Sequence, residues 1–133
     1  MAAARGALKV ERVTVTLVPQ GDVRGTLRVP STYSSIQRTY HWRRAADLEY
    51  MIVPTRVSSK EVQVDFFINI AGLARQKVKD LPKTLRGFVE GMLGTEWKGL
   101  RLGAIGKPCA ALPPREAIVR GTIEDILGGN LEG

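Results

Sequence analysis

Cationic and aromatic side chains alternate in one short stretch of this chain, RTYHWRR at residues 38–44. The residues that could do chemistry there are Arg38, Tyr40, Trp42, Arg43 and Arg44. Guanidinium groups bind phosphates and aromatic rings stack on bases, so this mixture is typical of proteins that bind single-stranded or branched nucleic acid. The alternative is that Tyr40 and Trp42 pack into a core while the arginines are only solvated.

A second basic stretch, ARQKVKDLPKTLR at residues 74–86, holds five cations and a single acid. Its cations are Arg75, Lys77, Lys79, Lys83 and Arg86. The first three precede the expected start of a helix, and a helix N-terminus itself attracts phosphate. The stretch therefore favours contact with DNA or RNA, against the alternative of an ordinary solvated loop.

The acid in this stretch, Asp80, has two interpretations. It is either a catalytic carboxylate beside a basic groove or the N-cap of the helix that follows. Apolar residues recur at helical spacing from Leu81 to Leu93, Pro82 stands in the first turn, and Gly94 follows the last apolar position. This pattern favours the cap.

Enzymatic chemistry has few other candidates in the sequence. His41 and Cys109 stand far apart without zinc-ligand spacing, and no phosphate-binding or dinucleotide-binding glycine motif is present. A two-metal nuclease needs about three convergent carboxylates. The acids that would have to converge are scattered, at Asp65, Asp80, Glu90 and Glu96. We therefore expect no metal site and no cofactor, with Mg²⁺ bound only if the chain is a nuclease, and the balance is against an enzyme.

The elements that position these residues follow from periodicity and turn residues. Alternating apolar residues predict strands, and the 3.6-residue spacing predicts helices. We expect strands at 10–18, 23–30, 60–70 and 98–108, a loop leading into a short helix at 42–52, a helix at 81–93, a loop at 109–114, and a strand or terminal helix within 115–127. The order predicts an α+β fold, an antiparallel or mixed sheet of about four to five strands with one or two helices packed on one face.

Length, charge and composition indicate the domain organisation and the kind of partner to expect. The 133 residues suit a flexible segment at 1–9, a single domain at 10–127 and a tail at 128–133. The net charge of +7 favours a polyanionic partner. No apolar run reaches the ~20 residues of a membrane helix, and one cysteine fits a reducing compartment. We expect a protein that is not secreted and that acts in the cytoplasm, a nucleus or organelle, or a virion.

The segment from residue 60 to 100 resembles the RusA-type Holliday-junction resolvases. In that family a strand leads into a basic loop, a D-L-D-N-x-x-K motif opens a helix, and a G…W segment precedes a further pair of acids. Here VQVDFFINI is followed by ARQKVK, then DLPKTLR at residues 80–86, FVEGMLG, and Glu96-Trp97. The resemblance implies a resolvase-like fold with a basic surface for nucleic acid.

The departures from the family pattern concern its metal-binding positions. The second acid of the motif falls on Pro82, its lysine falls on Arg86, and the later acid pair falls near Lys98 and Gly99. Only Asp80 carries over. The resemblance therefore implies an inactive relative.

These observations lead to three hypotheses. The first is a non-catalytic basic domain, a degenerate resolvase-like protein, that contacts DNA or RNA through residues 38–44 and 75–86. The second is a structural or assembly subunit of a virion or ribonucleoprotein complex, with protein partners or as a homo-oligomer. The third, weakened by the missing acids, is a metal-dependent, structure-specific endonuclease.

Overall fold

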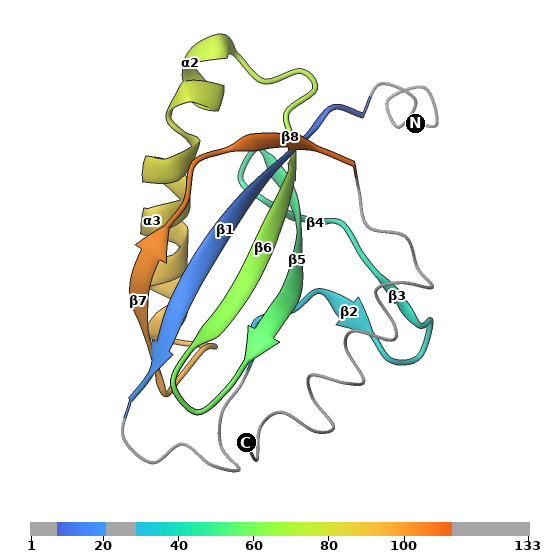
Figure 1. The fold of residues 1–133 in the computed structure, drawn as a ribbon. Coiled ribbons are helices and arrows are strands. Elements are labelled where there is room, and N and C mark those ends of the chain that lie inside the picture. The colour runs from blue at the N-terminus through green and yellow to red at the C-terminus, as the bar shows by residue number, and fades with distance from the viewer. Residues whose placement is uncertain (1–7, 21–28, 113–133) are drawn as a thin grey trace.

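A twisted antiparallel sheet forms the centre of the protein, as a computed structural model describing residues 8–20 and 29–112 shows (Figure 1). Its long strands are β1 (Val10–Pro19), β5 (Leu48–Val57) and β6 (Val62–Asn69), and its shorter strands are β4 (Arg43–Ala45), β7 (Leu100–Ile105) and β8 (Cys109–Ala111). The order is β4-β5-β6-β1-β7, and β8 also pairs with β1. The predicted α+β class is confirmed, and the sheet, predicted as antiparallel or mixed with about four to five strands, is antiparallel with six strands among the described residues.

Four further elements complete the described part of the chain. A small hairpin joins β2 (Tyr33–Ser34) to β3 (Thr39–Tyr40), and two helices, α2 (Arg75–Lys79) and α3 (Leu81–Leu93), follow β6. Among the described residues, no helix is long and apolar enough to cross a membrane.

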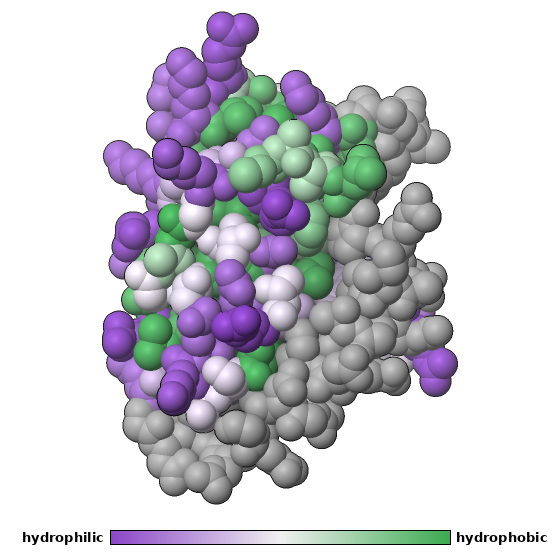
Figure 2. All heavy atoms as spheres, in the orientation of Figure 1, coloured by the Kyte–Doolittle hydropathy of each residue, from purple (hydrophilic) through white to green (hydrophobic). Residues whose placement is uncertain are grey.

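The central strands alternate as their residues predict. On β1 the side chains of Val13, Val15 and Leu17 are fully buried, and between them Thr14 and Thr16 are only half-buried on the opposite face. The register places Val15 opposite Val64 of β6, so the buried valines of the two strands share one face. Figure 2 shows the face turned away from α3, where hydrophilic side chains are interspersed with hydrophobic ones.

Helix α3 packs against the face with the buried valines through Leu81, Leu85 and Val89. The helix predicted over 81–93 is confirmed. Phe66 is the centre of this layer: its ring lies 6.2 Å from that of Phe88 on α3 and 6.4 Å from that of Trp97, both edge-on. The ring of Tyr50 on β5 lies 6.2 Å from that of Phe66 and 5.3 Å from that of Phe88. Edge-to-face packing of this kind stabilises aromatic clusters beyond their buried area.

The short helix expected within 42–52 is wrong, because these residues form the β4–β5 hairpin. Its two-residue turn contains Ala46, whose φ of 55° lies in the left-handed region. Strand β5 buries Met51, Ile52 and Val53 in succession, since both faces of the sheet are covered at this point. A strand buried on both sides loses the alternation that identifies strands in a sequence and leaves a continuous apolar run.

Several predicted boundaries also change. Residues 31–41, expected as a loop, contain β2 and β3, and the expected loop at 109–114 contains β8. Of the predicted strand at 23–30 only Val29 and Pro30 are described, and neither is in a strand. Gly94 ends α3 with a right-handed φ of −84°, so it is not a left-handed cap. The element predicted at 115–127 lies outside the described residues.

Phe66→Ala should lower the free energy of unfolding by about 3–5 kcal/mol, because it removes a fully buried ring that joins β5, β6, α3 and Trp97. Urea denaturation followed by far-ultraviolet circular dichroism measures the loss. The control is Ile36→Ala, at a side chain that is 92% exposed, which should stay within about 0.5 kcal/mol of the parent protein. A loss under about 1 kcal/mol for Phe66→Ala would contradict this view of the core.

Candidate nucleic-acid interface

Five cations lie exposed on α2 and the first half of α3: Arg75, Lys77, Lys79, Lys83 and Arg86. We call these residues the helical basic surface. Figure 2 shows hydrophilic side chains crowded over α2 at the top of the molecule. The first three cations do not approach a helix as a loop, as expected, but form the separate short helix α2, which buries none of its residues. The predicted residues therefore remain exposed to solvent on two consecutive helices.

Asp80 lies at the junction of the two helices and does not cap α3 with its side chain. Its backbone has φ −90° and ψ 6°, a turn conformation unlike the extended one of a capping residue. Its carboxylate instead accepts a hydrogen bond from Gln76 Nε2 of α2, at 3.1 Å. Asp80 takes the predicted N-cap position, but the predicted capping interaction is wrong because the carboxylate is turned toward α2.

An ion pair connects the helical basic surface to the β4–β5 turn. Lys77 Nζ of α2 donates to the carboxylate of Asp47, and both side chains are about half exposed. An exposed pair of this kind contributes little stability. Its value here is geometric, because it holds α2 beside the turn that follows β4, the strand that carries Arg43 and Arg44. The α2 end of the helical basic surface therefore lies beside the β4–β5 turn.

The aromatic residues of the 38–44 stretch belong to a second hydrophobic cluster. Tyr40 is 8% exposed and packs with Met51 and Phe67 on the sheet face opposite α3. Its ring meets that of Tyr33 edge-on at 5.1 Å, and Trp42 packs half-buried against the same cluster. Tyr40 is therefore not available to stack on a base, which corrects its assignment as a nucleic-acid contact. Tyr40 instead packs into a hydrophobic cluster, as the alternative interpretation of this stretch expected.

The arginines of the same stretch are exposed but point in different directions. Arg38 lies in the β2–β3 turn with a left-handed φ of 58°. In the backbone register of the β4–β5 hairpin, Arg44 lies opposite Glu49 and Arg43 lies opposite Tyr50. Neighbouring strand residues face opposite sides of a sheet, so Arg43 lies on the α3 side and Arg44 on the other. The stretch is not a single patch.

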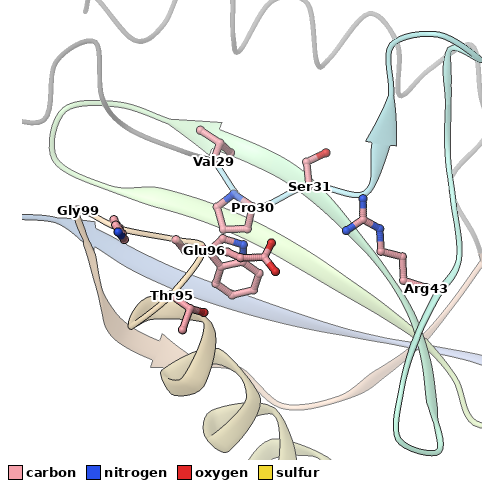
Figure 3. A pocket seen from close by; sticks show the side chains of 9 residues that line it. Val29, Pro30, Ser31, Arg43, Thr95, Glu96 and Gly99 are labelled. Atoms are coloured by element: carbon pink, nitrogen blue, oxygen red, sulfur yellow. The ribbon is translucent and has the colours of Figure 1, made fainter.

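Arg43 borders a cavity of about 800 Å³ between β4 and the turn that follows α3. Its lining comes from three segments: Val29, Pro30 and Ser31; Arg43; and Thr95, Glu96, Trp97, Lys98 and Gly99. Figure 3 shows the Arg43 guanidinium directed toward Ser31 and the Glu96 carboxylate entering the same space. From the sequence Glu96 is a candidate only as a nuclease acid, and the cavity has no local signal, because its three segments are separated by more than ten residues each.

The pKa of Tyr50 depends on two charged groups beside this cavity. Burial raises the pKa of Tyr50, the Arg43 guanidinium partly opposes that rise, and the Glu96 carboxylate adds to it. The phenol is therefore within electrostatic reach of both charged groups. On the opposite face, burial raises the pKa of Tyr40 well above its ordinary value, which Ser31 only partly offsets. The Tyr40 hydroxyl is buried without a hydrogen bond of normal geometry.

The acids considered for metal binding do not converge in the described part of the chain. Asp65 accepts a hydrogen bond from Thr14 Oγ1 at 2.7 Å on the open face of the sheet, whereas Asp80 lies between the helices. Glu90 is exposed on α3, and Glu96 borders the cavity. Among residues 8–20 and 29–112, no three His, Cys, Asp or Glu side chains form a group that could hold a metal ion.

Comparison of the chain with protein-family models, with curated proteins and with solved structures finds no match. The resemblance to RusA-type resolvases stays a prediction from the motif at residues 60–100.

Stability should fall as the pH rises above about 10, where the unfolded tyrosines ionise. Both Tyr40 and Tyr50 have a raised pKa in the folded protein, so folding favours their neutral forms. Their contribution is complete below the unfolded pKa and is lost as the pH climbs toward the folded one. Tyr40→Phe should make this loss shallower, because it removes the more strongly shifted phenol. Urea unfolding of both proteins at about pH 8 and about pH 11 measures the difference, and equal losses would contradict the assignment.

Proposed function

We propose that this protein is a non-catalytic nucleic-acid-binding domain that holds the phosphate backbone of DNA or RNA on its helical basic surface. The observation that supports it is the exposure of five cations within the twelve residues from Arg75 to Arg86. Of these only Lys77 is engaged in an ion pair with a described residue. The other four cations are exposed and form no ion pair with a residue that the structure describes, so they are suited to binding phosphates.

The expected binding mode is electrostatic. Each lysine or arginine that neutralises a phosphate releases a counterion, which drives association and makes it depend on salt. The net charge of +7 adds long-range attraction. Since Tyr40 is buried, the stretch at 38–44 supplies arginines more than a stacking platform. Arg38 and Arg44 are further exposed cations outside the helical basic surface, and we expect contacts to the backbone to outweigh reading of the bases.

The alternatives have weaker support. The endonuclease hypothesis has no cluster of carboxylates in the described residues on which to build a metal centre. The assembly hypothesis is supported by Ile36, an apolar side chain 92% exposed in the β2–β3 turn. Single exposed apolar residues are common on monomeric proteins, so this observation is less informative than the five cations.

The test is filter binding of a single-stranded DNA and an RNA of equal length across a salt series. We expect log K to fall against log salt with a slope of about −3, from four to five phosphate contacts on a single strand. Lys83→Ala with Arg86→Ala should weaken binding at least about tenfold and make the slope shallower by about 1.4.

The matched control is Arg56→Ala with Lys60→Ala, which removes the same charge from exposed positions at the β5–β6 turn. This turn lies at the opposite end of the molecule from α2 (Figure 1). The control should retain most of the affinity and the slope. Equal losses in both double variants would show that net charge alone is responsible. No binding, together with concentration-dependent oligomers in sedimentation, would favour the assembly hypothesis instead.

A further inference from the structure

The cavity beside Arg43 has the size and polarity of a site for a small charged ligand. Its volume of about 800 Å³ lies within the range of ligand pockets, roughly 300–1,000 Å³. Charged and hydroxyl-bearing side chains contribute to its lining, from Arg43, Glu96, Lys98, Ser31 and Thr95. Below it, Phe66 and Phe88 hold Trp97 edge-on, with the indole 7% exposed. The wall that carries Glu96 and Lys98 is thus fixed to the core.

The charges around the cavity are not paired with one another. No ion pair joins Arg43, Glu96 or Lys98 to any residue that the structure describes. Both Arg43 and Glu96 act electrostatically on Tyr50, so they stand close to the same place without neutralising each other there. Figure 3 shows the two groups directed into a common space. Opposite charges held apart around a cavity are suited to a ligand that presents an anion to one and hydrogen-bond donors to the other.

We propose that this cavity binds a nucleoside monophosphate, with the phosphate on Arg43 and Lys98 and donor groups of the ribose or base on Glu96. Two cations against one carboxylate favour an anion, and guanidinium–phosphate pairs are among the strong charge-assisted hydrogen bonds. The carboxylate would repel a bare phosphate, and the volume exceeds what phosphate needs. The choice of a nucleotide over other phosphorylated compounds rests on the proposed function, whereas the cavity is separate from the helical basic surface.

Fluorescence of Trp97 provides the test, since the chain has two tryptophans and Trp42→Phe leaves Trp97 as the sole emitter. The probe is adenosine 5′-monophosphate, added up to about 10 mM with excitation beyond the adenine absorption, and calorimetry on the unaltered protein repeats the measurement. We expect saturable binding. Arg43→Gln should weaken it at least about tenfold, as should replacing the probe by adenosine or by inorganic phosphate.

Glu96→Gln separates the two halves of the proposed contact. It should reduce the preference for adenosine 5′-monophosphate over inorganic phosphate, because it removes the repulsion of the bare ion and weakens the contact to the ribose or base. The matched control is Lys107→Ala, which removes one exposed cation between β7 and β8 that does not line the cavity and should leave this affinity unchanged.

The inference is overturned by the absence of saturable binding, by equal affinity for adenosine or for phosphate, or by an unchanged affinity in Arg43→Gln. None of these results tests the salt-dependent binding of oligonucleotides. Conversely, if the unaltered protein does not bind oligonucleotides, the proposed function is wrong. The affinity for the mononucleotide is measured separately and is not decided by that result. The two failures are therefore distinguishable.

Discussion

The packing of Phe66 is the interaction on which the rest of this structure depends. Its ring is fully buried and contacts the rings of Tyr50 on β5, Phe88 on α3 and Trp97 after the helix. One side chain thereby fixes the helix to the sheet and the following turn to both. Since Glu96 and Lys98 flank Trp97 in sequence, the position of the cavity wall is a consequence of core packing. A polar site is held in place by apolar contacts.

The same packing decides which surfaces remain for function. Helix α3 uses Leu81, Leu85 and Val89 against the sheet, which leaves its cations on the outer side. On the opposite face, the second cluster takes Tyr40 out of solvent and leaves the nearby arginines exposed. The two hydrophobic clusters therefore separate what looks like one mixed aromatic and basic stretch in the sequence. The aromatics stabilise the fold, and the cations remain exposed to solvent.

Much of the fold can be predicted from periodicity, because a helix or strand with one buried face and one solvent-exposed face alternates apolar and polar residues regularly. Helix α3 follows this rule, strand β6 follows it except at Phe67, which is buried on the opposite face, and the sequence predicts both with nearly the observed bounds. Strand β5 breaks it, because Met51 and Ile52 are buried on opposite faces by clusters assembled from distant segments. Local preference over 42–52 favoured a helix, and tertiary burial overrode it. The capping role of Asp80 failed for a similar reason, since α2 competes for its carboxylate.

What the sequence by itself determined is the inventory of the site: the excess of cations, their grouping at 38–44 and 75–86, and the scarcity of clustered acids. The tertiary structure alone decided that Arg43 and Arg44 face opposite sides of the sheet. It also decided that Ser31, Arg43 and Glu96 share one cavity. The physical reason is that side-chain direction on a strand is set by its pairing register, and a one-residue shift reverses every side chain. That register depends on β5 and on the helix packed beneath it, which no local pattern specifies.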